Sequence, residues 1–173
     1  MPKKPPIRPP LVACALGVGA LATAPAHADI ITISDIMMDG WQVNPPIPDA
    51  GTGIARVTID TNTRAMTIAG TYSAMTSEVL AAHLHGPADP DQNSPLIIFP
   101  LTHTGGLAGS FSGGRTLSQT QFDAFMASRT YINVHTADHT AGEIRGQIIV
   151  PGPGGPAALL GVALLATRRR RHP

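Results

Sequence analysis

The sequence of residues 29–150 predicts an all-β fold, a small antiparallel β-sandwich or Greek-key barrel with one short covering helix. Three observations lead to this prediction. Short segments rich in Thr, Val and Ile recur along the chain, and these residue types favour strands. Turns that contain Gly, Pro, Asn or Asp separate the segments. A single stretch has the start signals of a helix.

The first half of this region predicts an N-terminal strand followed by a hairpin. Ile30–Ile36 alternates apolar and polar residues, which is typical of a half-buried strand. Gly53–Ile59 and Arg64–Tyr72 are rich in Thr, Val and Ile, and Asp60-Thr61-Asn62-Thr63 joins them. Two such runs around a short polar turn predict a β-hairpin.

The second half predicts further strands and the helix. Strands are expected at Val79–His85, Leu96–Leu101, Leu107–Ser112, Tyr131–His135 and Glu143–Val150, the last two forming a closing hairpin.

The helix is predicted over Gln119–Ala127. Ser118 can cap its first turn, and Gln121 can return the hydrogen bond as a capping box. Leu117 and Phe122 have the spacing of a hydrophobic staple. One apolar face is expected to pack on the sheet, formed by Phe122, Phe125 and Met126.

Residues 1–28 have the three parts of a secretory signal peptide. A basic start precedes the apolar run Leu11–Ala22, and Ala26-His27-Ala28 is a small-residue cleavage site for signal peptidase. Cys14 suggests a lipoprotein signal instead, but there the apolar run would precede the cysteine, and here it follows. We therefore expect export and cleavage after Ala28. Cys14 is the only cysteine, so the mature domain must fold without disulfides.

Residues 151–173 resemble a PEP-CTERM sorting signal, in which a proline motif, an apolar helix and a basic stop follow one another. The corresponding parts are Val150–Pro153, Ala157–Ala166 and Arg168–Arg171, with Gly152 where the family has Glu. The apolar part is shorter than the roughly 20 residues that span a bilayer. The resemblance implies a transient membrane anchor, and cleavage near Pro151 by an exosortase-type enzyme in the cell envelope.

The charge of the domain argues against nucleic acid as a partner. Between Asp29 and Val150 the chain has eleven acidic residues, five arginines and no lysine, a formal charge of −6. Such a surface repels phosphate backbones.

Histidines at alternating positions make a candidate metal site. Residues i and i+2 of a strand share a face, so His83 and His85 project together. His135 shares a face with Tyr131 and Asn133 in the same way. The opposite faces are expected to enter the core through Leu80, Ala82, Leu84, Ile132 and Val134. If the two strands are neighbours, three or four histidines converge, and His139 in the adjacent loop would be the fourth. Imidazole ligands suit copper or zinc.

A layer of hydrogen bonds is the alternative interpretation of the same histidines. In it, His83, His85 and His135 bond to polar neighbours and loop carbonyls and hold the strand ends. Asn133, Glu143 and Arg145 are the expected side-chain partners. We favour this layer, because short metal motifs often occur without a metal.

Other motifs carry little chemistry. Asp89–Asn93 opens like a calcium loop, but Ser94 and Pro100 stand where the EF-hand needs Gly and Glu. Glu143 and Arg145 are expected to form a surface or cross-strand ion pair. No nucleophile elbow or phosphate-binding loop is present.

The two histidine motifs together resemble the CHRD domain, named after chordin and common in bacterial envelope proteins. They are AHLHGPA at 82–88 and YINVHTADHTAGEIRGQI at 131–148, and the resemblance spans about Gly51–Ile149. Together with the two targeting segments, it divides the chain into a signal peptide (1–28), a CHRD domain (29–150) and a sorting segment (151–173). It also implies a non-enzymatic binding or scaffolding module with an extracellular protein or polysaccharide as partner.

An enzymatic alternative rests on a second resemblance. A His-x-His strand on a β-sandwich is similar to copper–zinc superoxide dismutase. That family needs more histidines than the processed domain has, and an intradomain disulfide that this chain cannot form. We therefore expect no catalytic activity.

Overall fold

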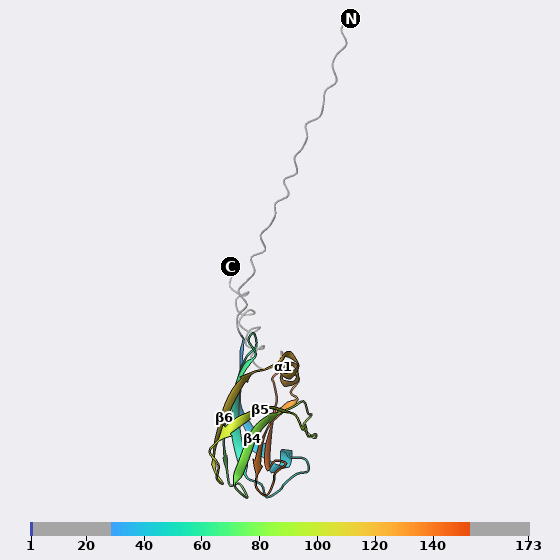
Figure 1. Ribbon diagram of the computed structural model, residues 1–173. Coiled ribbons are helices and arrows are strands. Elements are labelled where there is room, and N and C mark those ends of the chain that lie inside the picture. The colour runs from blue at the N-terminus through green and yellow to red at the C-terminus, as the bar shows by residue number, and fades with distance from the viewer. Residues whose placement is uncertain (2–28, 153–173) are drawn as a thin grey trace, which may run out of the picture.

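The domain is a closed barrel of eight antiparallel strands (Figure 1). The computed structural model describes Met1 and residues 29–152. The expected signal peptide and most of the expected sorting segment therefore lie outside the described residues. The elements, in chain order, are β1 (Ile30–Asp39), a 3-10 turn η1 (Gly40–Gln42), β2 (Thr52–Asp60), β3 (Ala65–Ser73), β4 (Val79–His85), β5 (Ile97–His103), β6 (Gly109–Thr116), α1 (Gln119–Met126), β7 (Thr130–Thr136) and β8 (Ile144–Ile148).

The strand order around the barrel is β1-β2-β3-β6-β5-β4-β7-β8. The chain passes from β3 to β4, returns through β5 to β6 beside β3, and then crosses again to β7 beside β4. This is a Greek-key arrangement. It confirms the predicted all-β class and selects the barrel over the open sandwich. It also makes β4 and β7 hydrogen-bonded neighbours, which is what the histidine hypothesis required.

Local sequence explains the β2–β3 hairpin, which the structure confirms. The strands pair from Thr52 with Ser73 to Ile59 with Met66. In the turn, the backbone amides of Asn62 and Thr63 both donate to Oδ1 of Asp60 at 2.9 Å. This short acidic side chain therefore stabilises the turn itself.

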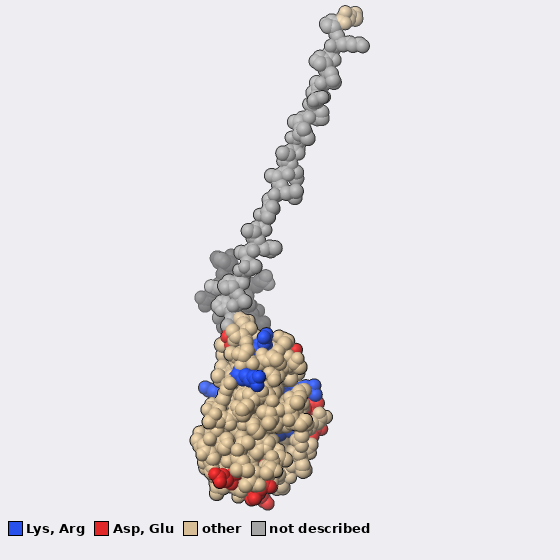
Figure 2. Space-filling model, viewed as in Figure 1, with Lys and Arg blue, Asp and Glu red and all other residues tan. Residues whose placement is uncertain are grey.

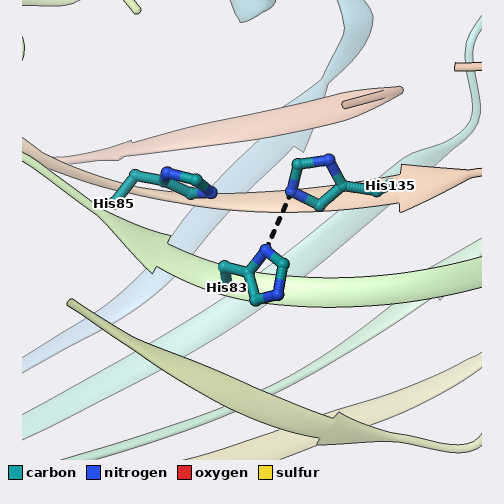
Figure 3. A group of neighbouring side chains, drawn as sticks. All are labelled: His83, His85 and His135. Carbon is teal, nitrogen blue, oxygen red and sulfur yellow. Dashed lines mark hydrogen bonds between the residues drawn. The ribbon is translucent and has the colours of Figure 1, made fainter. Parts of the chain in front are cut away.

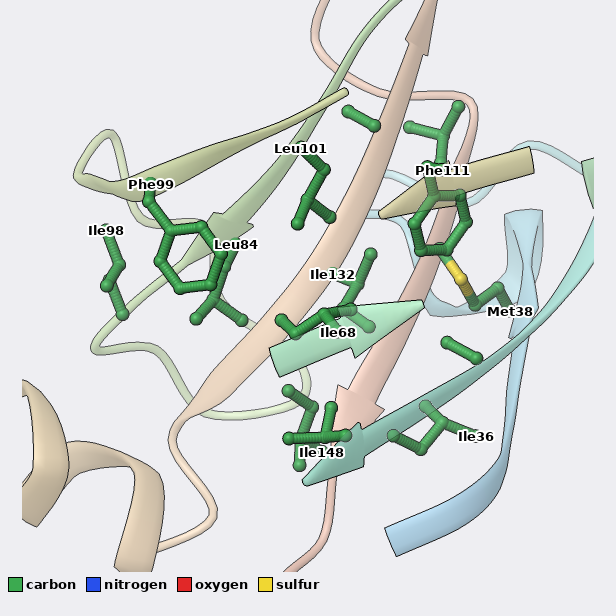
Figure 4. Packing of buried hydrophobic residues seen from close by; sticks show 14 of the residues in the cluster. Ile36, Met38, Ile68, Leu84, Ile98, Phe99, Leu101, Phe111, Ile132 and Ile148 are labelled. Carbon is green, nitrogen blue, oxygen red and sulfur yellow. The ribbon is translucent and has the colours of Figure 1, made fainter. Parts of the chain in front are cut away.

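The interior of the barrel is filled mainly by aliphatic side chains and methionines, with aromatic rings that include Phe99 and Phe111 (Figure 4). Leu84, Ile132 and Ile148 are fully buried at its centre. Gly70 on β3 faces this core, because a Cβ there would overlap the ring of Phe111. The packing accounts for the small residue in the middle of a strand.

Helix α1 begins as its sequence predicts. The backbone amide of Gln121 donates to Oγ of Ser118 at 3.3 Å, and the backbone amide of Ser118 donates to Oε1 of Gln121 at 3.0 Å. Phe125 is fully buried beneath the helix. Met126 was expected on the same face, but it is 41 % exposed, because it ends the helix one position past the buried residue. Within residues 29–152, no helix is long and apolar enough to cross a membrane.

The inward face of β4 differs from the prediction at its first residues. Leu80 was expected in the core and is 55 % exposed, while Val79 is buried instead. The register between β4 and β7 shifts between Val79 and Ala81. Such an irregularity changes which residues face inward, and the regular alternation resumes at Ala82.

Charged side chains on the surface are sparse. Figure 2 shows one face of the molecule, on which acidic side chains gather at the lower end and basic ones lie in the upper half. The described residues form no continuous basic stripe on this face.

Candidate functional site

Three histidines meet on the outer face of the barrel, where β4 and β7 pair (Figure 3). Ala82 and Leu84 enter the core, so His83 and His85 between and beside them face outward. On β7, His135 pairs with Ala81, and Asn133 with His83. One ligand nitrogen from each histidine lies within 4.8 Å of the other two. His139 and His103 are not part of this group.

Backbone carbonyls fix the tautomers of two of these rings. Nδ1 of His85 lies 3.2 Å from the carbonyl oxygen of Ser94, and Nδ1 of His135 lies 3.0 Å from that of Thr140. A carbonyl can only accept, so in each neutral ring Nδ1 carries the hydrogen and Nε2 carries the lone pair. Both rings thereby present the lone pair of Nε2 toward the cluster, which is the form of the ring that could bind a metal ion.

The ring of His83 contacts the ring of His135. Nδ1 of His83 lies 3.1 Å from Nε2 of His135. Because that Nε2 has a lone pair, His83 donates a hydrogen to it in the metal-free state. Two nitrogens bound at about 2.05 Å to one tetrahedral ion would be about 3.3 Å apart. The observed spacing therefore fits two ligands of a single metal once His83 takes the tautomer with its hydrogen on Nε2, which leaves the lone pair on Nδ1.

Burial keeps the cluster uncharged. Burial, together with the neighbouring His135 and His83, lowers the pKa of His85 to about 4. Burial is also the main cause that lowers the pKa of His83 and of His135. All three imidazoles are therefore neutral near pH 7, the form that binds metal ions.

A stack of side chains supports His85 from β7 and β8. Tyr131 lies flat against His85, with ring centroids 5.3 Å apart and an interplanar angle of 12°. The guanidinium carbon of Arg145 lies 3.7 Å from the centre of the Tyr131 ring. Because β7 runs between β4 and β8, Tyr131 separates His85 from Arg145.

The same side chains hold a loop over the site. The backbone amide of Ser94 donates to the Tyr131 hydroxyl at 3.0 Å, and that hydroxyl donates to the Ser94 carbonyl at 3.3 Å. Nη1 of Arg145 donates to the Gln92 carbonyl, and Nη2 to the Asp89 carbonyl. In Asp89–Asn93, the segment that opens like a calcium loop, two carbonyls therefore accept hydrogen bonds from Arg145. Ser94, the next residue, contacts His85.

Glu143 and Arg145 do not form the ion pair expected from the sequence. Glu143 is 0 % exposed and Arg145 is 1 % exposed. The Glu143 carboxylate accepts hydrogen bonds from the backbone amides of Gly51 and Thr76 and from the hydroxyls of Thr76 and Thr136. Burial would raise its pKa, but these hydrogen bonds outweigh burial and lower the pKa overall. The two charges are therefore stabilised separately, by neutral groups.

The predicted hydrogen-bonded layer is present only in part. Loop carbonyls do accept from His85 and His135, but the three histidines make no hydrogen bond to Asn133, Glu143 or Arg145. Nε2 of His85 is buried and has no partner among the described residues. Tyr131 lies on the same face of β7 as His135, so this spacing was the sequence signal that places an aromatic ring beside the site. The burial of Arg145 gave no sequence signal, because its partners lie in a distant loop.

Fold and site together define a small Greek-key β-barrel module with a histidine cluster on its outer face. The family model described as the CHRD domain matches residues 35–148. The chain therefore belongs to the CHRD family, which confirms the resemblance seen in the two histidine motifs. Searches among curated proteins and among solved structures gave no match.

Proposed function

We propose that the domain is an exported, non-catalytic binding module that holds a copper or zinc ion on His83, His85 and His135. The proposal combines a binding role, which membership of the CHRD family supports, with a defined site. The ligand nitrogens are Nδ1 of His83 and Nε2 of His85 and His135. Three protein ligands leave a fourth tetrahedral position for solvent or a partner.

The unpartnered Nε2 of His85 is the observation that carries this proposal. A buried polar atom without a hydrogen bond is rare and calls for an explanation. A hydrogen-bonded layer leaves this lone pair unused, whereas a metal ion would use it. The Nδ1 contacts to carbonyls have the form of the outer-shell contacts that orient metal-binding histidines. For these reasons we now prefer the metal site to the layer that the sequence favoured.

Export to the cell envelope completes the proposal. Its support is the sequence of the expected signal peptide and sorting segment, of which only residues 151 and 152 are described. Signal peptidase and an exosortase-type enzyme would process the chain, and the C-terminal segment would anchor it in the membrane until then. The final partner is an extracellular protein or polysaccharide.

Metal content tests the site directly. We expect the exported protein, purified without chelator, to contain about one copper or zinc ion per chain by mass spectrometry. The double variant His83→Gln/His85→Gln should lose that ion, and adding metal should no longer raise its melting temperature. His139→Gln, a loop histidine outside the group, is the matched control and should keep the ion.

Two results would point away from a metal. An empty wild-type protein whose melting temperature ignores copper and zinc would contradict the site. A double variant that is less stable than wild type even in metal-free buffer, by the full difference seen with metal, would assign the histidines a structural role only.

A scaffolding role without metal is the second candidate, and membership of the CHRD family favours it. It would appear as binding to a cell-surface protein or polysaccharide that the His83→Gln/His85→Gln variant retains in full.

A further inference from the structure

We infer that the ion selected by this site is monovalent copper, Cu(I), and that Arg145 sets this selection. The inference rests on the proposed metal site and adds the identity and charge of the ion. It follows from the charges around the cluster.

The ligands themselves carry no charge to balance an ion. Among residues 29–152 the metal-binding group consists of histidines alone, without a carboxylate or a thiolate. A bound ion would therefore keep its full charge in a site where His85 is buried. The cost of an unbalanced charge in such surroundings rises steeply with the charge.

A fixed cation lies one ring away from the cluster. Arg145 is buried, and its two terminal nitrogens donate to the Gln92 and Asp89 carbonyls and to Oε1 of Gln147. The ion pair found in the described part of the chain joins Arg129 to Asp89 and leaves Arg145 without an acidic partner. Burial lowers the pKa of Arg145, and Tyr131 and Asp91 offset only part of that effect. Asp91 is exposed and forms no ion pair with Arg145.

This cation disfavours a divalent ion more than a monovalent one. Arg145 stacks on Tyr131, and Tyr131 stacks on His85, so the guanidinium and a bound ion would be about 10 Å apart. Repulsion at that distance doubles when the charge of the ion doubles. Three neutral nitrogens complete a trigonal site for Cu(I), whereas Zn²⁺ requires a fourth ligand. Both effects favour Cu(I).

Competition titrations with the full exported chain test the inference. Cu(I) affinity is measured anaerobically against bicinchoninate, and Zn²⁺ affinity against a chromophoric chelator. Wild type should bind one Cu(I) more tightly than Zn²⁺. In Arg145→Met the preference for Cu(I) over Zn²⁺ should fall about tenfold, since one unit of charge at about 10 Å has an effect of that size.

Three further variants separate charge from structure. Arg145→Lys keeps the charge without the guanidinium hydrogen bonds, and should retain the Cu(I) preference. Arg56 is an exposed residue of β2, which lies across the barrel from β4. Arg56→Met removes its charge and should leave the preference for Cu(I) unchanged. Asp91→Asn removes an acid whose charge acts on Arg145 and should raise the preference for Cu(I). Its exposed position makes it informative even if Arg145→Met fails to fold.

Each contrary result overturns a defined part of the argument. If Zn²⁺ binds at least as tightly as Cu(I), or if Arg145→Lys loses the preference as fully as Arg145→Met, the inference fails while the metal site stands. An unchanged preference in both Arg145→Met and Asp91→Asn also overturns it. If neither ion binds to the wild-type protein, the proposed function fails with it.

Discussion

Glu143 and Arg145 are buried charged residues whose partners are neutral groups. They therefore differ from a surface ion pair, in which two opposite charges stabilise each other. Arg145 donates to loop carbonyls and stacks on Tyr131, while Glu143 accepts four hydrogen bonds from backbone amides and threonine hydroxyls. A buried carboxylate that is fully hydrogen-bonded stays ionised, and removing its charge leaves several donors poorly matched.

Glu143→Gln should therefore destabilise the fold by about 3 kcal/mol at pH 7, measured by chemical denaturation. The amide oxygen can still accept from the backbone amides of Gly51 and Thr76, but the uncharged acceptor is weaker. The amide NH2 group then faces the hydroxyls of Thr76 and Thr136, which must change from donors to acceptors. Glu78→Gln, an exposed matched control, should change the free energy of unfolding by less than about 0.5 kcal/mol.

The pH dependence of stability offers a second measure of the same residue. The pKa of Glu143 is lower in the folded chain than its ordinary value, so its contribution is complete above the unfolded pKa. That contribution is lost as the pH falls through the lowered pKa. Glu143→Gln should lose less stability than wild type over this acid range. Parallel acid profiles for the two proteins would contradict this account.

Among the structural elements, those set by short-range signals agree best with the sequence. The β2–β3 hairpin and the capped helix α1 form where their turn and cap residues predict. Leu80 was misplaced because a register shift with β7 changes the alternation at the start of β4. Nothing in residues 79–85 alone reveals that shift.

The histidine site was predictable in its members but not in its surroundings. The spacing of two residues placed His83 and His85 on one face, and the same rule selected His135. The loop that covers His85 is held by Tyr131 over 37 residues of sequence and by Arg145 over 53. Such contacts leave no periodic signal, so a surface ion pair was predicted where the structure has buried charges.

The contribution of the N-cap of helix α1 to stability can be measured by substitution. Ser118→Ala removes the side chain that accepts from the amide of Gln121, and should lower the free energy of unfolding by about 1 kcal/mol. Ser118→Asp should restore most of it. Ser112 is an exposed residue of β6, and Ser112→Ala is the control, whose free energy of unfolding should remain close to that of the wild type. Equal losses at both positions would argue against a role of the cap.

For the molecule as a whole, the proposed export predicts a processed chain. The protein recovered from the envelope of a host with an exosortase-type enzyme should begin at Asp29 and end near Pro151, as measured by intact mass and N-terminal sequencing. Ala28→Phe, which places a bulky residue at the cleavage position, should retain residues 1–28. A chain of 173 residues found in the cytoplasm would contradict the proposal.

The pairing of β4 with β7 has a consequence for a chain that, after the expected cleavage, has no cysteine. His83 and His135 are 52 residues apart in sequence and in contact in the barrel. An ion held by both would act as a removable cross-link that closes a long loop of the chain. Exported domains usually obtain such a cross-link from a disulfide bond. Unlike that bond, it would be formed and broken by metal supply, so the rigidity of this domain would follow the composition of its surroundings.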